Sequence, residues 1–436
     1  MSAANVVAPS VENAWKPTML HLPFRLLHAW ASAPALFFLL TLTAMLFRPP
    51  DLKAFPVDRI ALGLLMGCVA LRVCARAEET RTHPITWPLL ALTLLAAAGL
   101  WGSPFQAQSW SLLAAKWIVP LVLFHLAGAA FTAPHQLRYL DVFCIAVLVY
   151  LSVVSIFFLF GIKSLIFPRF ILDPSVGIHV DRARGPFLQA VANGVSLNIL
   201  GLVALNSYQR GRLSAPVAML LFAAMPVALL ATKTRAVWIS AAFSIAAIWV
   251  FCRNREVRRV AITMCVLACI GSVAFWLRNL NSSEFAERLR DQSPVDFRSE
   301  IYAAGWEMFL ERPVLGWQDE ATVQAEVARR VSDFRPDYYV FHNTFLELAV
   351  QRGIVGLGLY AWLIVCLFRL SRGGNTQTFA DAEFRRLWVI ILAVYLINAS
   401  AVVMNYQFVN GLVFTFAGIL AAQKTHAREL LIRQDV

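Results

Sequence analysis

The chain has 436 residues, 59% of them hydrophobic and 15% charged, with a mean hydropathy of +0.64. Soluble domains carry about 25% charged residues, so this composition excludes a soluble globular domain of independent size. We expect membrane lipids around this protein and no nucleic-acid partner.

Apolar runs long enough to cross a ~30 Å hydrocarbon core recur along the sequence. We therefore predict an all-α polytopic membrane protein with about 12 transmembrane helices. Residues 1–29 are expected to form a cytoplasmic or interfacial segment without a cleavable signal peptide, so the first span is retained. The predicted spans are 30–47, 57–75, 85–101, 108–131, 138–161, 187–206, 215–231, 235–252, 259–278, 353–369, 386–403 and 408–423.

Arginines in the short loops indicate the orientation. They gather on one side of the predicted spans, which the positive-inside rule assigns to the cytoplasm together with both termini and the tail 424–436. The longer polar segments 162–186 and 279–352 then lie on the opposite, outer face. Their many arginines escape the orientation rule, and an anionic ligand on that face would account for them.

Two basic segments are predicted to converge with a histidine on the outer face. One contains Arg182, Arg184 and Gly185 before the sixth span, and the other places Arg235 at the entrance of the eighth. Arginine suits phosphate because its planar fork donates parallel hydrogen bonds, and helix N-termini add free N–H donors. We predict a pyrophosphate site containing Arg184 and Arg235, although contacts with lipid head groups are an alternative.

His342 is the candidate general base. Thr344 and Glu347 have the spacing of a capping box, which predicts a helix beginning there. An imidazole on the approach to a helix N-terminus stays neutral, and a neutral imidazole can accept a proton from a sugar hydroxyl. The alternative is a structural histidine at the membrane interface.

The large outer segment contains one predicted amphipathic helix, residues 299–311, followed by a turn signal. Its expected apolar side comprises Ile301, Tyr302, Trp306, Phe309 and Leu310. For residues 319–337 we expect a mobile loop, whose arginines could alternatively meet phosphates of an acceptor.

The sequence offers no cofactor or metal site. The seven cysteines fall in predicted spans or at their ends, and Asp51 and Asp58 are isolated carboxylates rather than the paired ones that Mg²⁺ prefers. Because no nucleotide-binding glycine loop is present, an ATP-driven pump is disfavoured.

The motifs resemble the O-antigen ligase family, within the O-antigen ligase and polymerase superfamily, over roughly residues 150–370. The most specific element is His342-Asn343 followed, after nine residues, by Gly353-Ile354-Val355-Gly356. The supporting elements are Arg184-Gly185-Pro186-Phe187 with Asn193, Thr234-Arg235, and Arg298 followed by Trp306, Pro313 and Gly316.

This resemblance implies a glycosyltransferase of the multi-helix GT-C type in the inner membrane of a Gram-negative bacterium. It implies transfer of a glycan from undecaprenyl pyrophosphate to a sugar of lipid A–core in the periplasm, without metal and with inversion. His342 would be the base, and Arg184, Arg235 and, more weakly, Arg298 would hold the pyrophosphate.

Three other functions remain open. An O-antigen polymerase and a protein O-oligosaccharyltransferase would use the same lipid-linked donor. A flippase for lipid-linked glycans belongs to another class and should carry charges near the membrane midplane. In this sequence charge concentrates on one face, and Lys116 lies near enough to the outer end of its span to snorkel outward, so an enzyme is favoured.

Overall fold

The fold was analysed in a computed structural model of the full chain. It describes residues 30, 33–48, 57–76, 82–101, 105, 107–177, 179–251, 254–279, 293–318, 320–331, 341–372 and 382–434. Every regular element in this part of the chain is helical, which confirms the all-α prediction.

Each predicted span coincides with a helix. In chain order the helices are α2 (Pro34–Leu46), α3 (Val57–Arg76), α4 (Thr86–Trp101), α5 (Ala107–Leu113), α6 (Val119–Ala130), α7 (Pro134–Leu159), α8 (Ala190–Gln209), α9 (Ala215–Ala231), α10 (Arg235–Phe251), α11 (Arg255–Asn279), α13 (Ser293–Glu311), α14 (Glu320–Arg330), α15 (Thr344–Arg369), α16 (Ala382–Ala399) and α17 (Gln407–Gln434). A π-helical turn, η2 (Ala114–Ile118), joins α5 to α6.

Five helical segments in the described residues are long and apolar enough to cross a membrane: Ser109–Ala130, Pro134–Leu159, Ala190–Gln209, Arg255–Phe275 and Thr344–Arg369. Several shorter apolar helices accompany them, including α2, α4, α9 and α10. The protein is therefore a multi-pass membrane protein. The count of 12 spans, the GT-C architecture and the orientation stay predictions.

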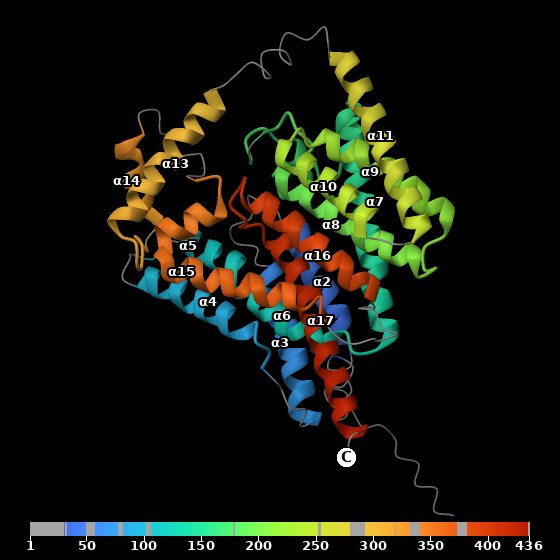
Figure 1. The fold of residues 1–436 in the computed structure, drawn as a ribbon, viewed down its shortest axis with the longest axis horizontal. Helices are drawn as coiled ribbons and strands as arrows, with labels where there is room; N and C mark the ends of the chain where they lie inside the picture. Colours follow the sequence, from blue (N-terminus) through green and yellow to red (C-terminus); the bar gives the residue numbers. More distant parts are fainter. Residues whose placement is uncertain are drawn as a thin grey trace, which may run out of the picture.

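Helix α8 forms the centre of one half of the bundle, with 94% of its most apolar stretch buried. Helices α7, α9, α10 and α16 pack around it, whereas α6 and α17 pair in the other half (Figure 1). Helices α13 and α14 lie together at one edge of the molecule, beside the beginning of α15 (Figure 1).

Helix α15 is broken at Gly353, and the segment 313–318 crosses the break. We call this segment the strap. Gly353 has φ 61° and ψ −160°, outside the helical region. On one side of the break, the strap donates backbone hydrogen bonds from Trp317 to the carbonyl of Val350 at 2.9 Å, and from Gln318 to that of Gln351 at 2.9 Å. The break therefore leaves these helix carbonyls paired within the protein, as a membrane-embedded backbone requires.

After Gly353, α15 donates the backbone hydrogen bonds and the strap accepts them. The N–H of Ile354 donates to the carbonyl of Pro313 at 2.7 Å, and that of Val355 to Val314 at 3.3 Å. A Cβ atom on Gly353 would lie 2.2 Å from the carbonyl oxygen of Val314. The predicted turn after residue 311 therefore packs against α15 at residue 353, where the sequence predicts the start of a span.

The outer segment is more ordered than expected. Residues 320–330 form helix α14 rather than part of a mobile loop, because Val323 and Val327 pack into a small core with α13. The side chain of Arg330 donates to both carboxylate oxygens of Glu311, at 2.7 and 2.9 Å, and does not point out as a free phosphate ligand. Arg335 lies outside the described residues.

The apolar side expected for α13 is only partly correct. Ile301 is buried, and Tyr302 and Phe309 pack against the same core. Trp306 and Leu310 are instead 56% and 59% exposed, so they neither face this core nor pack on the other helices. The buried positions follow Ile301, Ala304 and Met308, at the three- and four-residue spacing of a helix face.

Replacing Gly353 with alanine should destabilise the protein. The backbone conformation at Gly353 is essentially restricted to glycine and costs another residue about 1–3 kcal/mol, to which the close approach of Val314 adds. We expect a lower midpoint of thermal unfolding in detergent. Gly358→Ala is the control, because a Cβ there meets no atom within 4 Å; equal midpoints for the two variants would contradict the strained junction.

Candidate functional site

His342 lies immediately before α15 and is fixed from both sides. Its neighbour Phe341 is buried against α13, where a Cβ on Gly305 would lie 2.7 Å from the Phe341 ring. On the other side, the Asn343 side chain caps α15 by accepting hydrogen bonds from the N–H groups of Phe345 and Leu346, at 2.9 and 3.2 Å. His342 itself has φ 44°, which is uncommon for a residue other than glycine.

The helix begins where the sequence predicts, but the capping-box assignment is wrong. Asn343, not Thr344, is the N-cap residue. The hydroxyl of Thr344 donates to the carbonyl of Val402 at 2.9 Å and accepts from the N–H of Met404 at 2.9 Å. Thr344 therefore ties α15 to the connection between α16 and α17.

Glu347 is also engaged elsewhere. Its buried carboxylate forms an ion pair with Lys116, which lies in the π-helical turn η2 and is 11% exposed. Lys116 therefore points toward α15 and does not snorkel outward as expected. Pairing both charges reduces the cost of burying either one, and it fixes the first turn of α15 against η2.

Arg298 and Tyr302 of α13 lie beside His342. They are four residues apart and so share one face of the helix. The Tyr302 hydroxyl donates to the backbone carbonyl of His342 at 3.4 Å. Arg298 is exposed and close enough for its charge to act on the imidazole. The α13 helix thus brings a guanidinium to the candidate base.

The imidazole of His342 is held in its neutral form. Burial first, and then the positive charges of Arg298 and His179, lower the pKa of His342 from 6.5 to about 4. The direction agrees with the expectation of a neutral imidazole, but the main cause is burial rather than the helix N-terminus. His179 was not anticipated, and its position three residues before Arg182 is the signal that could have suggested it.

Arg184 has a different environment from the one expected. Its side chain is fully buried, and its guanidinium donates to the carbonyls of Ile171 at 2.9 Å, of Val176 at 2.5 Å and of Asp173. These bonds hold the loop 171–184 and leave the fork turned away from an external phosphate. The structure thus favours a loop-positioning role over direct binding.

The backbone near Arg184 also departs from the prediction. Gly185 begins a short 3-10 turn, Gly185–Phe187, and α8 begins only at Ala190. Arg184 therefore does not lie at the start of the span. Gly185 has φ 56°, and a Cβ on it would lie 2.9 Å from the Asn193 side chain. Gly185 and Asn193 form one packed unit, in keeping with a supporting role.

Arg235 lies where the sequence places it, as the exposed first residue of α10. The turn before it is joined to the Arg184 loop by a hydrogen bond from the N–H of Ala183 to the carbonyl of Ala231, 3.0 Å long. In the same loop the N–H of half-buried Arg182 donates to the carbonyl of His179 at 3.1 Å. The two basic segments are therefore adjacent, and His179 extends the loop toward His342.

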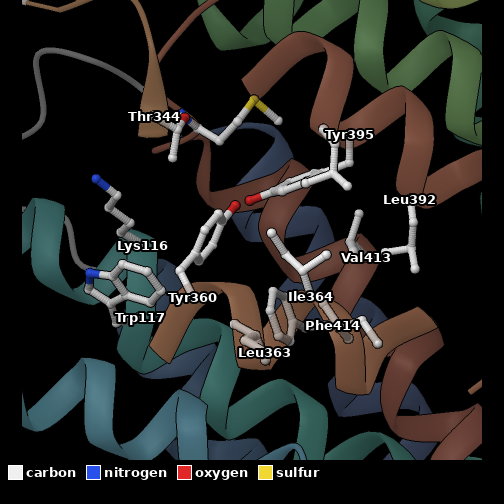
Figure 2. Close-up of a pocket in the computed structure, with 13 residues that line it drawn as sticks. Lys116, Trp117, Thr344, Tyr360, Leu363, Ile364, Leu392, Tyr395, Val413 and Phe414 are labelled. Atoms are coloured by element: carbon white, nitrogen blue, oxygen red, sulfur yellow. The ribbon is translucent and has the colours of Figure 1, made fainter. Parts of the chain in front are cut away.

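The cavity nearest to Thr344 is too small for a glycan. It lies between Lys116, Trp117 and two tyrosines, Tyr360 and Tyr395, whose hydroxyls point toward one another (Figure 2). Its volume is about 20 Å³, which is room for roughly one water molecule. This cavity is therefore not the place where a glycan binds. Among the described residues, no three His, Cys, Asp or Glu side chains are grouped to hold a metal ion.

Arg184→Lys should loosen the loop that carries His179. A lysine ammonium cannot reach three carbonyls arranged around a planar fork, and each lost charged hydrogen bond contributes about 1.5–3 kcal/mol. We expect a lower unfolding midpoint and faster amide hydrogen exchange in residues 171–184. The matched control is Arg235→Lys, since Arg235 is exposed; equal stability of both variants would contradict the anchoring role.

A comparison with protein families supports the motif-based prediction. Residues 218–361 match the family model described as O-antigen ligase. The matched region contains Arg235, Arg298, His342, Gly353 and Gly356, whereas the Arg184 loop lies before it. No curated protein matches the chain. Residues 218–361 of this chain are thus similar to the O-antigen ligase family, which supports the resemblance that the histidine–glycine motif predicts.

Proposed function

We propose that this protein is an O-antigen ligase that transfers a glycan from undecaprenyl pyrophosphate to a sugar hydroxyl of lipid A–core on the periplasmic face of the inner membrane. The family match over residues 218–361 supports ligase- or polymerase-type activity. The observation that carries the finer proposal is the neutral imidazole of His342, which lies just before the Asn343 cap of α15 and beside Arg298.

The proposed reaction is a single displacement. The acceptor hydroxyl attacks the anomeric carbon opposite the pyrophosphate, and His342 takes the hydroxyl proton as the new C–O bond forms. The bond from the anomeric carbon to the phosphate oxygen breaks, and the pyrophosphate leaves with its electron pair. The configuration at the anomeric carbon is inverted, and the donor is already activated, so no nucleotide is needed.

Arg235 and Arg298 are the proposed ligands of the leaving pyrophosphate. Arg235 is the exposed first residue of α10 and Arg298 is exposed in the second turn of α13, so both can present the paired N–H donors of the guanidinium to phosphate oxygens. Their fixed positive charge would stabilise the charge that develops on the leaving group without a metal ion. Arg184 and Arg182 act indirectly in this proposal, by shaping the loop that approaches His342.

Donor binding should also activate the base. With a pKa of about 4, His342 is neutral but weakly basic in the free protein. A pyrophosphate on Arg298 would offset the positive charge that depresses this pKa, and its own negative charge would raise the pKa further. His342 would therefore become an effective proton acceptor only once the donor is bound.

His342→Ala should abolish glycan transfer while leaving a folded, inserted protein. General-base catalysis contributes ~10²–10⁴-fold. In cells carrying the chromosomal mutation we expect core-only lipopolysaccharide together with accumulated lipid-linked polymer, measured by gel and immunoblot. Core bearing single repeat units would identify a polymerase instead, and an unchanged ladder would return His342 to a structural role.

Arg235→Lys should show whether Arg235 binds the pyrophosphate through the paired N–H donors of its guanidinium or only through its positive charge. Lysine keeps the charge but loses the paired donors of the guanidinium, so we expect severely reduced ligation at normal protein abundance. Wild-type ligation in this variant would show that Arg235 attracts the donor only through its charge.

The pH dependence of transfer should reveal the coupling between donor and base. Because His342 must be neutral to accept a proton, activity is lost as pH falls through its pKa. The acid limb of kcat/KM, which reports the free protein, should lie near pH 4, and that of kcat should lie at higher pH. Arg298→Gln should raise the first limb toward the second. Coincident limbs in the wild-type protein would contradict the proposed activation.

A further inference from the structure

A second cavity lies away from His342, between the end of α2, the first half of α3, the π-helical turn and the start of α17. Its volume is about 240 Å³, against about 20 and 40 Å³ for the cavities on either side of Lys116. The apolar part of its wall is formed by Leu62, Gly63 and Met66 of α3 and by Ala114 and Ile118 of η2. Nothing in the proposed transfer reaction uses it.

The mouth of this cavity is polar and positively charged. Arg48 and Arg59 line it, and both are exposed. One guanidinium has a carboxylate nearby: Arg48 lies 3.6 Å from the buried Asp58, which also accepts a hydrogen bond from Gln407 at 3.2 Å. The lining thus carries two guanidinium groups and one carboxylate, and the excess positive charge suits an anion.

The mouth lies on the same side of the bundle as the His342 segment. Arg48 donates to the side chain of Gln407 at 3.2 Å, and Gln407 is the first residue of α17. Three residues earlier, the N–H of Met404 donates to the hydroxyl of Thr344 at the start of α15. A short stretch of chain therefore connects the cavity mouth to the start of α15, which the candidate base His342 directly precedes.

The π-helical turn shapes both sides of this region. A π turn inserts an extra residue into a helix and occurs frequently at functional sites. Here it directs Lys116 toward Glu347, while Ala114 and Ile118 line the cavity on the other side. Ala114 and Gly63 both line the cavity, and their small size leaves space between η2 and α3. A Cβ on Gly63 would meet no atom within 4 Å.

We propose that this cavity binds a phosphate-bearing lipid. The phosphate would lie between the guanidinium groups of Arg48 and Arg59, where arginine can donate paired hydrogen bonds, and the hydrocarbon chain would run along Leu62, Met66 and Ile118. Two lipids share this chemistry, a membrane phospholipid and the polyprenyl chain carrier of the donor. Only the second source rests on the proposed function.

Gly63→Leu tests the proposal by filling the cavity. A Cβ on Gly63 meets no atom within 4 Å, so a side chain at this position starts in open space beside the cavity. Binding of phosphatidylglycerol, and separately of a polyprenyl phosphate, would be titrated by native mass spectrometry of the purified full-length protein. We expect at least ~10-fold weaker binding in Gly63→Leu, about 1.4 kcal/mol. Gly358→Leu, at an equally open glycine outside the cavity, should bind as the wild type does.

The head-group contribution is tested by Arg48→Gln with Arg59→Gln. This double variant should lose the preference for phosphatidylglycerol over phosphatidylcholine while still binding chains. Competition between polyprenyl phosphate and phosphatidylglycerol would identify the donor carrier as an occupant, and binding of phosphatidylglycerol alone would identify a phospholipid. Unchanged binding of both lipids by Gly63→Leu, or an equal loss in Gly358→Leu, would overturn the proposal. Because the assay contains no acceptor, its result is independent of glycan transfer.

Discussion

The exchange of backbone hydrogen bonds between the strap and the broken helix α15 is the constraint on which the candidate site depends. A break in a membrane helix frees carbonyl and N–H groups that lipid cannot satisfy. Here the carbonyls of Val350 and Gln351 and the N–H groups of Ile354 and Val355 all find partners in residues 313–318. The junction therefore fixes the end of α13 against the middle of α15.

This junction determines the surroundings of His342. Helix α13 leads directly into the strap, so the position of Arg298 and Tyr302 relative to the first turns of α15 is set by the same backbone bonds. Arg352, next to the break, reinforces the arrangement by donating to the carbonyl of Gln318 at 2.7 Å. A base and a cation that are far apart in the sequence are thereby held in one geometry, as catalysis requires.

Much of the fold could be predicted because hydrophobic length and periodicity are properties of the sequence itself. Helix α14 was missed because its polar composition hides the pair Val323 and Val327, whose burial depends on α13. The start of α15 was predicted correctly, but with Thr344 as the N-cap residue instead of Asn343. Both residue types are good helix caps, so the sequence alone does not distinguish them. Only the fold reveals that the Thr344 hydroxyl bonds to the connection before α17.

The arginines show what sequence cannot supply. Arg184 and Arg235 both occur beside turn residues at predicted helix starts, and the same chemistry fits both. Their difference lies in the acceptors within reach: the loop 171–176 presents three carbonyls to Arg184 and buries it, whereas Arg235 stays exposed. A residue type indicates what a side chain can bind, but only the fold determines whether its donors are already used.

The π-helical turn η2 lies between the start of α15 and the cavity lined by Arg48 and Arg59. Its lysine neutralises Glu347 one turn into α15, and its small residues open the cavity below Arg48 and Arg59. An ordinary α-helical turn would rotate Lys116 by about 100° relative to the residues that follow it, so one of these two contacts would be lost. The local distortion therefore shapes both the start of α15 and the cavity. A lipid pressing on Ala114 and Ile118 would act on the same turn that positions the base.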